Sequence, residues 1–177
     1  MQAHIKREKK KDYEEVDLLL KVAFEQDSVA ELVTELRKND SFIPELARVA
    51  RINNQIIGVI IYSHIQIIKG RKTFDAISMS PLAVLPHYQN LGIGGELILN
   101  SFAKARELGY QRVVVMGHEG YYPRFGFELA SDYGILCPFD VPDENYMVLE
   151  LSPDAFSKVS GKVKYDPLFK ELPSFTI

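Results

Sequence analysis

The sequence predicts a single mixed α/β (α+β) domain whose sheet is mostly antiparallel but contains one pair of parallel strands. Strand-like segments joined by short turns fill residues 47–85 and favour an antiparallel meander. A helical apolar pattern at 93–108 follows, and then a continuous apolar run at 112–116. A strand–helix–strand crossover of this length makes the two flanking strands parallel. The length of 177 residues is sufficient for one domain with a buried core.

Composition and charge exclude several classes of protein. Hydrophobic residues make up 46% of the chain and charged residues 25%, as in ordinary soluble proteins. The net charge of -3 argues against nucleic-acid binding, and no apolar run reaches membrane-spanning length. Charged residues fill the start of the chain, so no signal peptide is expected and the predicted location is cytoplasmic. Cys137 is the only cysteine, and four scattered histidines predict no metal site.

The start of the chain predicts one short strand and two helices. The strand is expected near residues 4–8. Asp12 is expected to cap the first helix, which carries one apolar stripe. The second helix is expected at about 28–37, with Ser28 as its cap and Glu31 at the spacing of a capping box.

Turn residues define the strands of the meander. Asn53 and Asn54 tolerate positive φ and predict a hairpin turn, and Gly70 marks a second turn. Gly58 stands early in the middle strand, where a side chain would otherwise protrude. The strands expected from these signals are 47–52, 55–66 and 73–85.

The end of the chain predicts further strands. Two antiparallel strands are expected around 133–137 and 146–151. Residues 152–154 are expected to cap a brief helix, and the alternating pattern near 161–169 predicts an edge strand. Exposed edge strands would also allow the chain to pair as a homodimer.

A glycine-rich loop joins the last meander strand to the long helix. It contains Gly92, Gly94 and Gly95. Glycines let the backbone approach a ligand closely, and a helix start offers unpaired N–H groups at the positive end of the helix dipole. These features predict a diphosphate site. Gly94 is followed by Gly95 and Glu96, where a Walker loop has lysine and serine or threonine, and Leu97 stands where a Rossmann motif has its third glycine, so neither nucleotide motif is present.

Two motifs in the second half of the chain resemble one known family. The loop at 89–94 reads Gln-x-x-Gly-x-Gly, and a Leu-Ala-Val-x-Pro strand end at 82–86 precedes it. Residues 117–127 read Gly-His-Glu-Gly-Tyr-Tyr-Pro-Arg-Phe-Gly-Phe. The first motif resembles the acetyl-CoA loop of the GNAT (GCN5-related N-acetyltransferase) superfamily, and the second resembles its Tyr-x-x-Leu/Phe-Gly-Phe motif. The Tyr-Tyr-x-Arg-Phe-Gly-Phe ending is similar to that of a bacterial subgroup of predicted acetyltransferases.

The resemblance implies a particular version of the predicted fold. GNAT proteins have a twisted, mostly antiparallel sheet with helices on both faces and a parallel strand pair that splays apart. The pantetheine arm of CoA fills that gap and pairs with the strand backbone. We therefore expect a GNAT N-acetyltransferase domain over residues 1–152, with a C-terminal extension over 153–177 packed on the same domain.

The resemblance also implies acetyl-CoA as cosubstrate, with no metal. Loop N–H groups would hold the diphosphate, and a strand N–H would polarise the thioester carbonyl. The cofactor-binding residues expected on this basis are Leu82, Ala83, Val84, Gln89, Asn90, Leu91, Gly92, Ile93, Gly94 and Gly95.

Tyr122 is the predicted catalytic residue, because it occupies the general-acid position of the family, four residues before Gly126. A phenol with a pKa of about 10 and a thiol with a somewhat lower one are matched closely enough for proton transfer. The general base stays open, because Ser80 and Pro81 stand where many relatives carry a carboxylate on the fourth strand. The remaining candidates are Glu119, His118 and water.

The function expected from these observations is transfer of an acetyl group from acetyl-CoA to an amine by direct attack in a ternary complex. The acceptor, a small molecule or a protein, is not specified by the sequence. The alternatives are an O-acyltransferase, an enzyme for a longer acyl donor, or a non-catalytic acyl-CoA-binding sensor, which the missing carboxylate favours. A scaffold with neither ligand nor chemistry is the remaining alternative.

Overall fold

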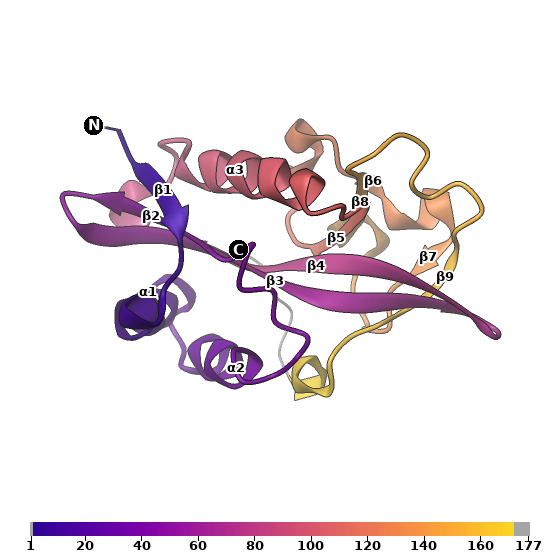
Figure 1. The fold of residues 1–177 in the computed structure, drawn as a ribbon, viewed down its shortest axis with the longest axis horizontal. Coiled ribbons are helices and arrows are strands. Elements are labelled where there is room, and N and C mark those ends of the chain that lie inside the picture. Colours follow the sequence, from indigo (N-terminus) through magenta and orange to yellow (C-terminus); the bar gives the residue numbers. More distant parts are fainter. Residues whose placement is uncertain (1, 172–177) are drawn as a thin grey trace. The chain divides into compact units, whose positions relative to one another are not determined.

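The computed structural model describes residues 2–171, which divide into two compact units. Of the described residues, 2–62 and 80–104 form the first unit, and 63–79 and 105–171 form the second. The chain therefore passes between the units more than once, and two long strands contribute to both (Figure 1).

The sheet of the first unit is antiparallel. Strand β1 (His4–Arg7) pairs with β2 (Arg48–Ile52), and β2 pairs with the first part of β3 (Gln55–Lys69). Asn53 and Asn54 connect β2 to β3 with φ values of 49° and 67°. Both residues thus adopt the left-handed conformation of a tight hairpin turn, as the sequence predicts.

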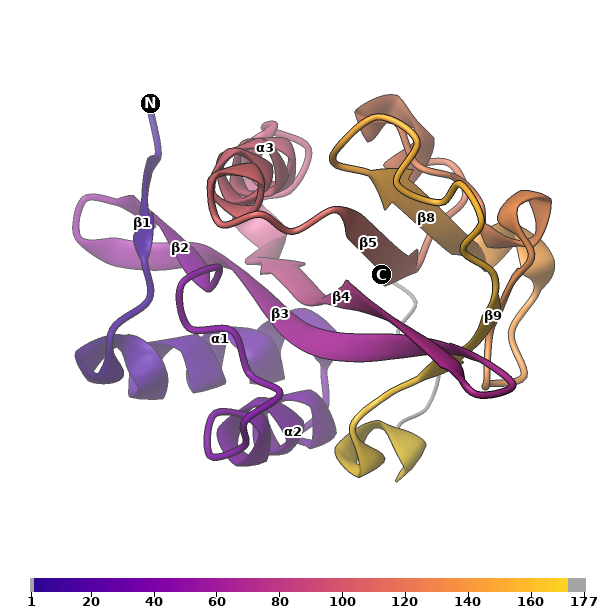
Figure 2. The same cartoon turned by 45° about the vertical axis from the view of Figure 1, so that its right-hand side comes forward.

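Helices cover both faces of the sheet in the first unit. Figures 1 and 2 show α1 (Tyr13–Phe24) and α2 (Ser28–Leu36) on one face and α3 (Ile93–Glu107) on the other. Their apolar stripes face the sheet, and this burial is the main favourable contribution to the packing. Fully buried side chains of these helices include Val16, Leu20, Val33, Leu36, Leu97 and Ile98.

The predicted helix caps are wrong at both N-termini. Asp12 stands at the N-cap of α1 but makes no capping bond, and its carboxylate pairs instead with Arg51 at 2.7 Å. Helix α2 begins at Ser28, so Asp27 holds the cap position and its carbonyl accepts the N–H of Glu31 at 3.0 Å. The Ser28 hydroxyl is buried without a hydrogen-bond partner. The capping-box reading fails because the helical backbone starts one residue early.

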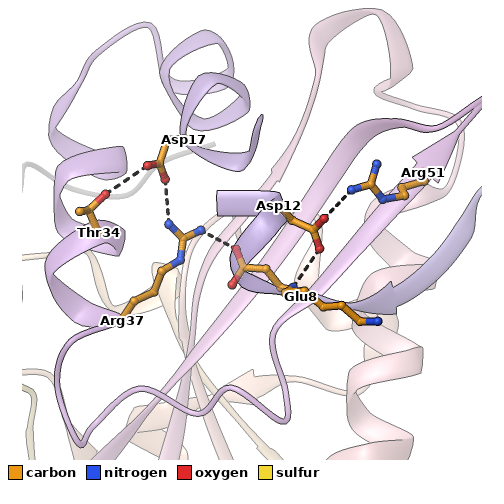
Figure 3. A network of polar contacts seen from close by, with 7 residues as sticks. Glu8, Asp12, Asp17, Thr34, Arg37 and Arg51 are labelled. Carbon is orange, nitrogen blue, oxygen red and sulfur yellow. Dashed lines mark hydrogen bonds and ion pairs between the residues drawn. The ribbon is translucent and has the colours of Figure 1, made fainter. Parts of the chain in front are cut away.

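A network of charged side chains, most of them buried, connects Glu8, just after β1, to the two N-terminal helices (Figure 3). The Arg37 guanidinium lies between Glu8 and Asp17, with a contact of 2.9 Å to Asp17, and it stacks 3.9 Å above the Tyr13 ring. The Thr34 hydroxyl donates to Asp17 at 3.3 Å. Burial raises the pKa of Glu8, while the charge of Arg37 opposes that rise.

The second unit contains the parallel strand pair. Ile77 of β4 pairs with Val113 of β5, and Ser78 pairs with Val114, in parallel register. The predicted crossover is therefore confirmed. β5 and β6 each pair antiparallel with β8. The bounds of these strands are β4 Lys72–Val84, β5 Arg112–Met116, β6 Glu128–Leu129 and β8 Tyr146–Glu150.

The segment predicted as a strand at 133–137 is mostly not extended. A 3-10 helix ends at Tyr133, and Gly134 follows with φ of 68°, which interrupts the strand backbone. Only β7 (Ile135–Leu136) remains, and it pairs with β9 (Gly161–Lys164) in parallel rather than antiparallel fashion. The sheet thus has a second, short parallel pair that the sequence did not indicate.

The C-terminal segment differs from expectation in one further respect. Residues 153–158 form turns instead of the predicted brief helix, and Asp154 has φ of 58°, outside the helical region. The predicted strand exists as β9, but it pairs with both β3 and β7 and is not an edge. The described chain ends in a 3-10 helix at Pro167–Glu171. The last part of the expected extension, 172–177, lies outside the described residues.

Candidate functional site

The glycine loop of the first unit lies between the end of β4 and the start of α3. The N–H of Leu85 donates to the carbonyl of Ile57 at 2.9 Å, which anchors the strand end on β3. A short 3-10 helix follows at Pro86–Tyr88. The side-chain amide of Gln89 then reaches back to the carbonyl of Val84 at 3.0 Å. The Gln89 side chain therefore ties the glycine loop to the end of β4.

The loop backbone is exposed and locally left-handed. Asn90 and Gly92 have φ values of 63° and 83°, and Leu91 between them is 65% exposed. A Cβ at Gly92 would have no atom within 4 Å, so open space surrounds this position. The first α3 residues, 93–95, carry N–H groups that helix geometry leaves without intrahelical partners. Exposed loop and helix start together could receive an anionic group.

Gly58 of β3 sets how closely α3 approaches the sheet. A Cβ at this position would lie 3.0 Å from Cδ1 of Leu97 and 3.3 Å from Cγ2 of Ile93. Both of these side chains are buried. Because Gly58 has no side chain, the first turns of α3 can pack closely against β3.

The strand residues before the loop expose little side-chain surface. Leu82 and Ala83 are buried, and Val84 is half-buried. The side chains of Leu82 and Ala83 pack in the core, so this strand end offers mainly its backbone groups to a ligand. Ser80 and Pro81 bring no carboxylate to the strand.

Tyr122 belongs to the second unit and is 7% exposed. It opens a 3-10 helix, Tyr122–Phe125. Its ring packs edge-to-face against Tyr121 and Phe127, with centroids 5.1 Å and 5.7 Å away. Burial, and then the neighbouring Tyr121, raise the pKa of Tyr122 well above that of a free phenol. The phenol is therefore protonated at neutral pH, as a proton donor must be, although it is a weaker acid than a free phenol.

The two candidate bases lie on the turn that follows β5. His118 and Glu119 are both exposed. The carbonyl of His118 accepts the N–H of Tyr121 at 3.1 Å, so the turn leads directly into the tyrosine pair. Glu119 lines a cavity of about 320 Å³ in the second unit; the other lining residues are Pro123, Phe127, Glu128, Leu129, Asp132, Glu144 and Met147.

The described residues give little support to a cysteine nucleophile, a metal site or a membrane-spanning helix. Cys137 is half-buried, and burial raises the pKa of its thiol, which disfavours the nucleophilic thiolate. Within residues 2–171, no group of three or more His, Cys, Asp and Glu side chains is placed to hold a metal ion. In the same range, no helix has the length and apolar character needed to cross a bilayer.

Together, the mixed sheet with its parallel pair, the helices on both faces and the strand–glycine loop–helix segment define an acyl-CoA acyltransferase fold. The family model described as an acetyltransferase (GNAT) domain matches residues 43–129. The N-acetyltransferase YhbS of Escherichia coli K12, itself uncharacterized, is 32% identical over 154 residues, which cover 87% of this chain and 90% of YhbS. The chain belongs to the GNAT acetyltransferase family.

Further relatives agree with this assignment. The uncharacterized N-acetyltransferase YjhQ of Escherichia coli K12 is 38% identical over 125 residues, 70% of this chain and 68% of YjhQ. The crystal structure of Escherichia coli YhbS in complex with CoA superposes with a TM-score of 0.90, covering 98% of this chain and 95% of that one. A GNAT acetyltransferase from Brucella melitensis in complex with acetyl-CoA has a TM-score of 0.76 at 28% identity, covering 95% and 98%.

These comparisons confirm the predicted family, fold class and enzyme class. Two of the similar structures hold CoA or acetyl-CoA. The individual cofactor-binding residues, the catalytic role of Tyr122 and the boundary at residue 152 stay predictions, as does the cytoplasmic location.

Proposed function

We propose that the protein transfers an acetyl group from acetyl-CoA to an amine of a small-molecule or protein acceptor by direct attack in a ternary complex. The observation that supports this most is the glycine loop. It is exposed, left-handed at Asn90 and Gly92, tied back by Gln89, and followed at once by a helix start. Similar proteins with the same fold bind CoA and acetyl-CoA.

The loop would hold the CoA diphosphate through backbone N–H groups. The open space at Gly92 and the small residues Gly94 and Gly95 allow phosphate oxygens to come close to the chain. The pantetheine arm would pair with the backbone of residues 82–84; the side chains of Leu82 and Ala83 are buried, and that of Val84 is half-buried. A strand N–H would then polarise the thioester carbonyl.

The proposed reaction has the following steps. The neutral amine attacks the thioester carbonyl carbon, a C–N bond forms, and the C–S bond breaks to release the CoA thiolate. The proton lost by the amine goes to Glu119, to His118 or to water. Tyr122 gives its phenolic proton to the thiolate. Burial makes Tyr122 a weaker acid than the sequence alone suggests. A thiolate that leaves in equally desolvated surroundings has its own pKa raised, which reduces the mismatch.

A non-catalytic acyl-CoA sensor is the second candidate. It is favoured by the absence of a carboxylate at Ser80 and Pro81 and by the exposure of both His118 and Glu119. A sensor would bind acetyl-CoA without needing a base.

Release of CoA thiol, followed with a thiol-reactive dye, distinguishes the two functions. The purified protein is incubated with acetyl-CoA and a panel of primary amines, alcohols, polyamines and lysine peptides. The proposal predicts amine-dependent thiol release and an acetylated amine by mass spectrometry. Binding of acetyl-CoA without turnover for any amine would support the sensor, and turnover with alcohols alone would indicate O-acylation.

A further inference from the structure

Gly117, the residue after β5, lies directly against the ring of Tyr122. A Cβ at position 117 would overlap Cε2 of Tyr122 and lie only 3.2 Å from Cζ and 3.3 Å from Cδ2. Gly117 is not among the residues with positive φ, so its backbone conformation is open to other residues. The tyrosine ring is therefore the reason why a side chain does not fit here.

Asn145 fixes the position of Gly117 by two hydrogen bonds. The N–H of Gly117 donates to the carbonyl of Asn145 at 2.9 Å, and the side-chain amide of Asn145 donates to the carbonyl of Gly117 at 3.1 Å. The pair continues the β5–β8 ladder, in which Met116 faces Tyr146. The backbone at Gly117 is thus held by the sheet and cannot easily retreat from the ring.

Two aromatic rings also pack against Tyr122. Tyr121 and Phe127 pack against it edge-to-face. With the Gly117 backbone as a further wall, the ring of Tyr122 is confined, and its hydroxyl group is confined with it. A displaced ring would carry the hydroxyl away from the place where it donates.

We propose that Gly117, held by Asn145, is a positioning residue that sets the location of the Tyr122 hydroxyl. This inference rests on the proposed function, in which Tyr122 donates a proton to the departing thiolate. In this proposal Gly117 acts on the reaction only through its contact with Tyr122.

The test compares Gly117→Ala with Tyr122→Phe and the double variant, using an amine that supports turnover. Misplacement of a catalytic group by about 1 Å can lower the rate by about a hundredfold. We expect Gly117→Ala to lower kcat by about tenfold or more, with KM for acetyl-CoA changed by less than about twofold. In the Tyr122→Phe background the same alanine should leave kcat unchanged within about twofold, because the donated proton is already gone.

Two further variants serve as a matched control and as a second test. Gly120→Ala adds the same methyl group three residues along the same turn, where no atom lies within 4 Å, and should leave kcat unchanged. Asn145→Ala releases the Gly117 carbonyl without adding a methyl group, and serves if Gly117→Ala fails to fold. It should lower kcat by a smaller factor, again only when Tyr122 is present. Near-ultraviolet circular dichroism, which needs no substrate, should change in Gly117→Ala but not in Gly120→Ala.

The outcomes separate this inference from the proposed function. If Tyr122→Phe lowers kcat but Gly117→Ala does not, the positioning role is overturned while the function stands. An equal loss from Gly117→Ala with and without Tyr122 identifies a general structural effect and also overturns it. If Tyr122→Phe leaves kcat unchanged, the acid role is wrong and the positioning role is overturned with it. An unchanged near-ultraviolet spectrum in Gly117→Ala overturns the positioning role even without any turnover.

Discussion

The side-chain amide of Gln89 donates to the carbonyl of Val84 at 3.0 Å and so ties the last residue of β4 to the start of the glycine loop. The bond lies at the surface, since Gln89 is exposed. This hydrogen bond holds the start of the glycine loop, whose backbone we propose to bind the CoA diphosphate. Because the loop is already held, CoA binding costs less conformational entropy.

Gln89→Ala should therefore weaken CoA binding without unfolding the protein. A hydrogen bond of this kind contributes about 0.5–1.5 kcal/mol, which corresponds to a rise in Kd of roughly 2- to 12-fold. Isothermal titration with CoA measures the change. The matched control is His87→Ala, an exposed residue two positions earlier that should leave Kd unchanged within about twofold. A wild-type Kd in Gln89→Ala would show that the bond does not organise the loop.

Arg37→Ala should destabilise the fold strongly. The Arg37 and Glu8 side chains are only 5% and 1% exposed, so removal of the guanidinium leaves buried carboxylate charge without its partner. Such losses amount to about 3–5 kcal/mol in the free energy of unfolding, measured by urea denaturation. Lys38→Ala breaks the exposed pair with Glu35 and should change stability by less than about 0.5 kcal/mol. Equal effects of the two substitutions would contradict the buried-network account.

As the pH rises, the wild-type protein should lose stability relative to a Glu8→Gln variant. Burial raises the pKa of Glu8 in the folded state above its ordinary value of 4.5, so the folded state binds the proton more tightly than the unfolded state. The resulting stabilisation is fully present below pH 4.5 and is lost as the pH rises through the folded-state pKa. Urea unfolding of both proteins across this range provides the comparison. The raised pKa of Glu8 would be refuted if the difference in stability between the two proteins did not vary with pH, or if the wild type gained stability as the pH rose.

The raised pKa of Tyr122 predicts the alkaline side of the pH–rate profile. A free phenol loses its proton near pH 10, and an acid catalyst with that pKa would lose activity there. Because burial keeps Tyr122 protonated to higher pH, kcat should not fall as the pH approaches about 10. Stopped-assay rates at saturating substrate test this. A decline in kcat with an apparent pKa near 10 that disappears in Tyr122→Phe would show a phenol with an ordinary pKa.

The parts of the fold that the sequence predicted are those with local causes. The Asn53-Asn54 turn follows from residues that tolerate positive φ, and the three valines at 113–115 are buried in the sheet, as their apolar character predicts. The crossover rule then made β4 and β5 parallel. The glycine loop was recognisable because its residue types and spacing are themselves the requirement for close backbone approach.

The parts that the sequence missed depend on contacts between distant residues. The parallel pairing of β7 with β9 joins short segments about 25 residues apart, for which no periodicity exists. The contact of Gly117 with Tyr122 and its bonds to Asn145 have no pattern either; a lone glycine after an apolar strand was the only signal. The Ser28 cap was wrong because α2 begins at Ser28 itself, one residue earlier than predicted.

The most direct test of the central claim is a thermal melt of the protein with acetyl-CoA, CoA or ATP. A ligand at 100 times its Kd stabilises the folded state by about 2.7 kcal/mol, which for a chain of this size raises Tm by roughly 5–10 °C. We predict this rise with acetyl-CoA and with CoA but not with ATP, since ATP lacks the pantetheine arm that would pair with β4. If neither acetyl-CoA nor CoA raises Tm, or if ATP raises it equally, the proposal that residues 82–84 and 89–95 bind acetyl-CoA is contradicted.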